Sequence, residues 1–181
     1  MQYLNQILAI DPGNTKSAFV ILDKNDCYPN IFDIVENQDL LDYFDAYQSD
    51  IGEVVIEMIT GYNMSVGQTV FDTCVWIGRF AERAFQCGKS VMLIPRREIK
   101  LHLCGNPRAK DKDITAALVD KFAPDIPNLG KGTKKEPGPF YGFKTDIWSA
   151  YAVGVSYLDW QKDNRLIPME KLQFIESEER I

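Results

Sequence analysis

Short apolar runs alternate with longer amphipathic segments along this chain. Five short runs, apolar throughout or at every second position, predict β-strands. They lie near residues 6–10, 17–23, 30–35, 53–58 and 90–95. Four longer segments repeat apolar residues at helical spacing and predict α-helices over residues 38–48, 68–87, 109–123 and 146–162. The order β-β-β-α-β-α-β-α-α predicts an α/β fold, built on one five-stranded mixed sheet flanked by helices.

The 181 residues predict one domain over residues 1–162, followed by a polar, acidic C-terminal tail over 163–181. Residues 124–144 contain four prolines and four glycines, a composition that predicts a loop between two helices. A loop of this length inside a compact domain is usually functional or disordered, so we treat it as a candidate binding element.

The composition, 45% hydrophobic and 25% charged, is that of an ordinary globular protein. No apolar run is long enough to predict a membrane span, and the N-terminus lacks the features of a secretory signal. We therefore expect a cytoplasmic protein. The four cysteines form no C-x-x-C pair, which disfavours a zinc site or a disulfide framework. His102 is the only histidine, and no G-x-S-x-G turn accompanies it.

The net charge of −6 conceals an uneven distribution. Residues 1–88 carry a net −9 and residues 145–181 a net −3, whereas residues 89–144 carry +6. A localised basic segment is the usual electrostatic footprint of nucleic-acid binding, although a solvated lysine-rich loop is the alternative. The candidate DNA-binding residues are Arg96, Arg97, Arg108, Lys110, Lys112, Lys131, Lys134, Lys135 and Lys144.

Three acids stand at the ends of apolar elements. Asp11 ends one strand, Glu57 ends another, and Asp146 opens the last helix. Such a placement is costly, because two like charges 4 Å apart repel by about 4 kcal/mol at an effective dielectric near 20. Oxygen ligands of this kind suit Mg²⁺, and nucleases commonly hold two such ions. Each acid alone is more often a helix cap or surface charge, but together they predict a Mg²⁺ site in which Mn²⁺ can substitute.

Four motifs in order resemble the RuvC-like Holliday junction resolvases of the RNase H-like superfamily, in a divergent, phage-type branch. DPGNTKSAFVIL, from Asp11, resembles the family's Asp-x-Gly turn between paired strands. VVIEMI is similar to the second motif, a Glu that ends the fourth strand. KLHLCGNPRAKDKDI, from Lys100, and TDIWSAYAVG, around Asp146, resemble the third and fourth motifs. The resemblance extends over residues 6–160.

The resemblance implies a metal-dependent endonuclease that cleaves branched DNA and acts as a homodimer, without a nucleotide cofactor. It also implies that this cytoplasmic protein acts in a bacterial host or phage-infected cell. It implies catalytic roles for Asp11, Glu57, Asp146 and Lys100, the three acids being metal ligands. Two positions depart from the family pattern. Phe143 stands where the family places a second Asp or His, and Asp111 replaces a family lysine. Asp111 is therefore a candidate fourth metal ligand, with a surface role as the alternative.

Other interpretations remain open at this point. The substrate can equally be RNA, as in RNA-processing RNase H-like nucleases, and a branched-DNA-binding protein without catalysis is a further alternative. Sugar-kinase and actin-type folds share the Asp-x-Gly-x-Thr turn, but they need a second domain that does not fit in 181 residues. The helix over residues 68–87 is either a core helix or a dimer interface. Residues 61–67 are a candidate DNA-facing loop, in which Tyr62 can stack on a base or simply pack.

Overall fold

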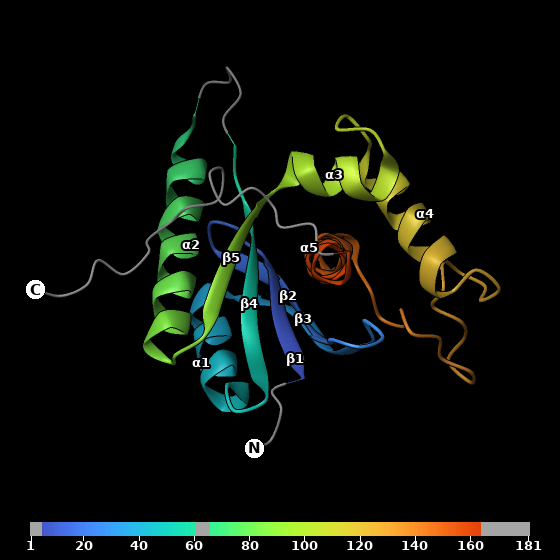
Figure 1. Cartoon of the computed structure of the whole chain (residues 1–181), viewed down its shortest axis with the longest axis horizontal. Coiled ribbons are helices and arrows are strands. Elements are labelled where there is room, and N and C mark those ends of the chain that lie inside the picture. Colours follow the sequence, from blue (N-terminus) through green and yellow to red (C-terminus); the bar gives the residue numbers. More distant parts are fainter. Residues whose placement is uncertain (1–4, 61–65, 164–181) are drawn as a thin grey trace, which may run out of the picture.

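The computed structural model describes residues 5–60 and 66–163 (Figure 1). The strands are β1 (Gln6–Asp11), β2 (Lys16–Asp23), β3 (Pro29–Glu36), β4 (Ile51–Met58) and β5 (Ser90–Pro95). The helices are α1 (Asn37–Tyr47), α2 (Gln68–Gln86), α3 (Arg96–Cys104), α4 (Asp111–Phe122) and α5 (Thr145–Lys162).

The five strands form one mixed sheet in the order β3-β2-β1-β4-β5. The first three strands pair antiparallel as a meander, and β1, β4 and β5 run parallel. The carboxyl ends of β1, β4 and β5 therefore lie at the same edge, which is where α3 begins. The α/β class and the five-stranded mixed sheet predicted from the sequence are confirmed.

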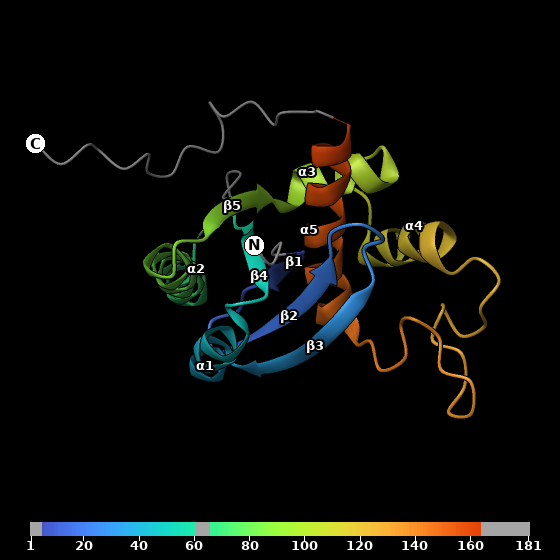
Figure 2. The same cartoon turned by 60° about the horizontal axis from the view of Figure 1, so that its bottom comes forward.

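Helices cover both faces of the sheet (Figures 1 and 2). Helices α1 and α2 lie on one face, while α5 crosses the other with α3 and α4 packed outside it. Each face has its own hydrophobic cluster. Helix α5 is apolar around almost its whole circumference, as expected for a helix enclosed between the sheet and two further helices.

A small residue lets α5 approach the sheet closely. A Cβ atom at Gly154 would lie 2.1 Å from the Leu22 side chain and 3.0 Å from the Ala9 Cβ atom. Any side chain here would push α5 away from β1 and β2, because such distances are far below van der Waals contact. The depth of α5 in turn determines how near its N-terminus comes to the ends of the central strands.

The four predicted helices are present, but α3 was not predicted. Its sequence, RREIKLHLC, is strongly polar, and Ile99 is its only fully buried residue. It also follows β5 without an intervening turn, so no loop signal marked its start. The predicted loop is confirmed: residues 123–144 contain turns and one isolated bridge between Gly132 and Pro137.

Two expectations from the sequence concern residues that the structure does not describe. The candidate base-stacking residue Tyr62 and the tail beyond residue 163 lie outside the described residues. Within the part of the chain that the structure covers, no helix combines the length and apolar character needed to cross a membrane.

Candidate active site

A hydrogen-bonded turn holds Asp11 at the end of β1. The Gly13 N–H donates to the Ser17 hydroxyl at 3.2 Å, and that hydroxyl donates to the side-chain oxygen Oδ1 of Asn37 at 2.6 Å. The side-chain amide nitrogen Nδ2 of Asn37 donates back to the Gly13 carbonyl oxygen at 2.9 Å. A Cβ atom on Gly13 would lie 2.2 Å from the Lys16 carbonyl oxygen, so only glycine fits. The turn therefore gives Asp11 a defined direction.

Asp11 and Glu57 lie side by side on the face of the sheet that α5 covers. Ile10 and Ile56 are paired in the parallel β1–β4 ladder, and the two acids follow them directly. Side chains alternate along a strand, so both carboxylates share a face with Ala9 and Val55, which pack in the α5-side core. Asp146 approaches from the exposed first turn of α5.

The electrostatics of Asp11 reflect this crowding. Burial, followed by the neighbouring charges of Glu57 and Asp146, raises the pKa of Asp11 to about 7, although Arg96 and the Ser149 side chain act in the opposite direction. Burial also raises the pKa of Glu57, against the lowering effect of Arg96. Asp11 therefore experiences the charges of both other acids that were predicted from the sequence.

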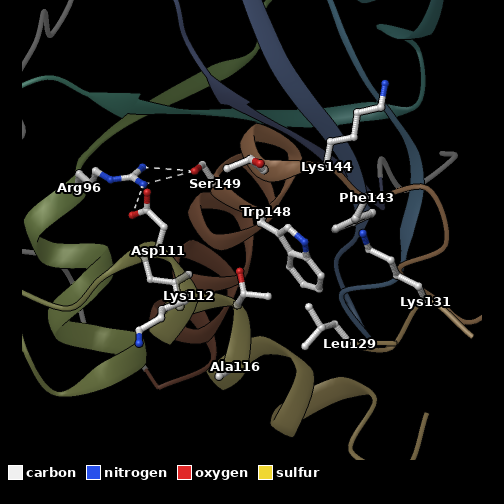
Figure 3. Close-up of a pocket in the computed structure, with 13 residues that line it drawn as sticks. Arg96, Asp111, Lys112, Ala116, Leu129, Lys131, Phe143, Lys144, Trp148 and Ser149 are labelled. Atoms are coloured by element: carbon white, nitrogen blue, oxygen red, sulfur yellow. Dashed lines mark hydrogen bonds and ion pairs between the residues drawn. The ribbon is translucent and has the colours of Figure 1, made fainter. Parts of the chain in front are cut away.

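Arg96 compensates part of this negative charge. Its guanidinium donates to Glu57 at 2.7 Å and, as Figure 3 shows, to Asp111, at 2.8 Å. It also lies 3.4 Å from the Ser149 hydroxyl. Burial alone would lower the pKa of Arg96, but the two carboxylates raise it overall, so the group stays charged. The sequence analysis assigned Arg96 to DNA binding and did not identify it as the partner of Glu57.

Lys100 and Asp111 complete the surroundings of Arg96. The Lys100 ammonium lies 3.7 Å from the Asp111 carboxylate, and its charge helps to lower the pKa of Glu57. The hydrogen bond from Arg96 holds the pKa of Asp111 below its ordinary value. Asp111 is therefore an ionised partner of two cations, and its role as a metal ligand stays a prediction.

The donor set suits a hard divalent cation, because its three acids supply only oxygen ligands. As the side chains stand, however, residues 5–60 and 66–163 contain no group of three His, Cys, Asp or Glu that could hold a metal ion. Glu57 is bonded to Arg96 through one carboxylate oxygen, Oε2. Ion binding by Asp11, Glu57 and Asp146 stays a prediction.

The predicted basic residues fall into two groups. Three of them, Lys112, Lys131 and Lys144, line a cavity beside the acids, together with Arg96. The others are exposed on α3, the α3–α4 connection and the tip of the long loop: Arg97, Arg108, Lys110, Lys134 and Lys135.

Phe143 is a core residue. It is 1% exposed and its ring lies 4.6 Å from Phe32, 5.2 Å from Phe140 and 4.9 Å from Trp148, measured between centroids. The position that the resembling family gives to an acid or histidine is therefore occupied here by part of an aromatic cluster. This cluster fixes the end of the long loop against α5.

Comparison with known proteins identifies the fold. No protein-family model and no curated protein matches the sequence. Solved structures do match: Thermus thermophilus RuvC has a TM-score of 0.65 at 14% identity, over 88% of this chain and 96% of that one. RuvC from T. thermophilus in complex with a Holliday junction substrate gives 0.63 at 12% identity, over 87% and 96%. The yeast mitochondrial Holliday junction resolvase Ydc2 gives 0.52 at 8% identity, over 88% and 81%. The chain has the RNase H-like fold of RuvC.

The substitution Asp11→Asn is expected to remove a pH dependence from the metal-free protein. The pKa of Asp11 is about 7 in the folded chain, against an ordinary value of 3.8. The folded state therefore retains a proton that the unfolded state has lost, so stability falls as the pH rises from about 4 to about 7. The full difference corresponds to roughly 4 kcal/mol. Asp11→Asn should be more stable than the parent at pH 8 and similar at pH 4.

Urea denaturation in the presence of a chelator measures this difference across the pH range. Asp42→Asn, which removes an exposed acid from α1, is the control for the removal of one surface charge. If the stability of the parent and of Asp11→Asn changed with pH in the same way, Asp11 would not be the group responsible for the pH dependence.

Proposed function

We propose that the protein is a metal-dependent endonuclease that hydrolyses phosphodiester bonds in branched DNA such as Holliday junctions. The observation that carries this proposal is the half-buried Asp11, whose pKa is raised by desolvation and by the charges of Glu57 and Asp146 at one edge of the sheet. The fold supports it, since the similar solved structures include a RuvC in complex with a Holliday junction substrate and a mitochondrial resolvase.

Asp11, Glu57 and Asp146 are the residues that would hold Mg²⁺ or Mn²⁺. When bound, such ions activate a water molecule for attack and stabilise the leaving oxygen of the phosphodiester. The chain's own residues prepare the site. Asp11 would give up its proton on binding a cation, because the positive charge favours the ionised carboxylate against the desolvation and repulsion that raise its pKa.

Arg96 contributes a second, permanent cation. Its bond to Glu57 offsets the negative charge of the acids, and its second bond, to Asp111, helps to hold the guanidinium in place. A guanidinium held in this place can donate to a phosphate oxygen of the substrate. Lys100, on the same helix, can place a further positive charge near that phosphate.

The contacts of Asp111 favour a role in anchoring Arg96 over a role as fourth metal ligand. A second candidate function has its own support: with Arg96 on Glu57 and Phe143 in place of an acid, the chain can be a branched-DNA-binding protein without catalysis. Cleavage assays separate the two functions.

We expect the parent to cleave a four-way junction in Mg²⁺ or Mn²⁺, and each of Asp11→Asn, Glu57→Gln and Asp146→Asn to abolish cleavage. Junction binding in the presence of a chelator should survive, because these substitutions remove negative charge from a DNA-facing site. The measurement is a gel assay on labelled junction, fork, duplex and RNA substrates, with Asp42→Asn as the control. Cleavage of RNA alone would establish the RNA-processing alternative, and binding without any cleavage would establish the inactive one.

The long loop over residues 124–144 is expected to contribute directly to junction affinity. Replacing Lys131, Lys134 and Lys135 together by alanine should reduce the slope of log K against log salt by about 0.9 for each phosphate that the loop no longer neutralises. Fluorescence anisotropy over a range of salt concentrations measures that slope. Lys16→Ala, on β2 outside the basic segment, is the control. An unchanged slope in the triple variant would mean that these lysines are only solvated.

The exposed face of α2 supports a homodimer. Phe71, Val75 and Phe85 are exposed to 57%, 62% and 43%, and their spacing puts them on one side of the helix. Large apolar side chains gathered in this way commonly mark an interaction surface. Val75→Arg is expected to convert a dimer into a monomer in light scattering, whereas Tyr28→Arg, at an exposed aromatic in the β2–β3 turn, should not. A parent that is already monomeric at high concentration would refute the assignment.

A further inference from the structure

We propose that the cavity between α4, the long loop and α5 binds one unstacked nucleotide of the substrate, directly beside the phosphate that is cut. This inference rests on the proposed nuclease function and adds a subsite to it. The cavity has a volume of about 580 Å³, within the range of small-ligand pockets and ample for one nucleobase with its sugar.

The cavity opens onto the acidic centre. Arg96, Asp111 and Ser149 line it at one end (Figure 3). Arg96 contacts Glu57, Ser149 is hydrogen-bonded to Asp11, and Asp111 is bonded to Arg96. A group bound in the cavity is therefore adjacent to any substrate group bound at the carboxylates of Asp11 and Glu57. For a nuclease, that neighbour is the nucleotide that flanks the scissile bond.

The body of the cavity is apolar. Trp148 and Phe143 form its inner side and Leu129 lies over its outer side (Figure 3). Leu129 is 55% exposed, an unusual position for a large aliphatic side chain unless a ligand covers it. A base that has left its stack loses apolar contacts on both faces, and a wall of this composition can replace them.

Basic side chains surround the apolar part. Lys112, Lys131 and Lys144 all line the cavity, and none makes an ion pair with any residue of the described ranges. The one acid in the lining, Asp111, is already paired with Arg96 and Lys100. The cavity therefore combines uncompensated positive charge with an apolar interior, which is the chemistry of a nucleotide: phosphate outside, base inside.

The wall formed by the loop is held in place by its own hydrogen bonds and packing. The Gly138 N–H donates to the Lys131 carbonyl at 2.9 Å, and the Phe140 N–H donates to the Gly130 carbonyl at 3.2 Å. Phe140 is fully buried against Trp148 and Tyr151 of α5. A preformed wall lowers the entropy cost of binding, which suits a subsite that must select one nucleotide.

Other occupants fit less well. Free phosphate would leave the apolar interior unused, and an acidic peptide would have no reason to lie beside the nuclease acids. A single-stranded nucleotide uses both parts, because base stacking and backbone charge together determine how proteins bind unpaired strands.

The test uses a fluorescent five-nucleotide thymidine strand and a matched strand with an abasic central position. The parent should bind the complete strand at least about fivefold more tightly, the lower end of what stacking of one base contributes. Ala116→Phe fills the cavity from the exposed side of α4 and should remove this preference, leaving affinity for the abasic strand unchanged. Leu101→Phe, an exposed position on α3 outside the cavity, should keep the preference. Equal binding of both strands by the parent, or a preference retained in Ala116→Phe, would overturn the proposal.

Thermal melting verifies that Ala116→Phe is folded, and Leu129→Glu, at an exposed position, gives a second way to spoil the cavity. A junction series with one abasic residue at each position around the cut extends the test to the full substrate. Junction cleavage without any base preference would refute the subsite but support the nuclease function. A clear base preference in the short strand, without cleavage of any branched DNA, would support the subsite but refute the nuclease function.

Discussion

Two carboxylates placed side by side, the half-buried Asp11 on β1 and the buried Glu57 on β4, are the constraint on which the arrangement around the candidate site depends. Their mutual repulsion is reduced by the charge of Arg96, which is bonded to Glu57, and by the proton that the raised pKa of Asp11 retains. Arg96 is the first residue of α3, its second carboxylate partner Asp111 is the first residue of α4, and Ser149 lies in α5. All three helices on this face of the sheet thus meet at the acids.

The site also shows how charge is divided within the fold. The sheet supplies acids from its central strands, where the surrounding core forces desolvation. The elements that lie outside α5, which are α3, α4 and the long loop, supply most of the positive charge. An anionic substrate can therefore be attracted by the outer layer and brought to acids that, unaided, would repel it. The net negative charge of the whole chain says little about this local arrangement.

The sequence was sufficient to predict features that repeat along the chain. Apolar runs identified all five strands, and helical spacing identified α1, α2, α4 and α5. It was insufficient where a single long-range contact decides the outcome. Helix α3 has one fully buried residue and so lacks a periodic signal. The pair Arg96–Glu57 spans 39 positions, and nothing in the local pattern distinguishes Arg96 from Arg97. The bonds that join Ser17, Asn37 and Gly13 are invisible for the same reason.

The burial of Phe143 has an evolutionary consequence. A single change to Asp at this position would put a carboxylate among Phe32, Phe140, Trp148 and Tyr151, where no polar partner awaits it and the poorer packing adds to the desolvation penalty. A fourth acid at this position would therefore require the aromatic neighbours to change as well. The packing of one loop thus limits how the site can vary: substitutions of Arg96, Asp111 or the lysines leave the aromatic cluster intact, whereas the acid or histidine that the resembling family carries at this position would not fit it.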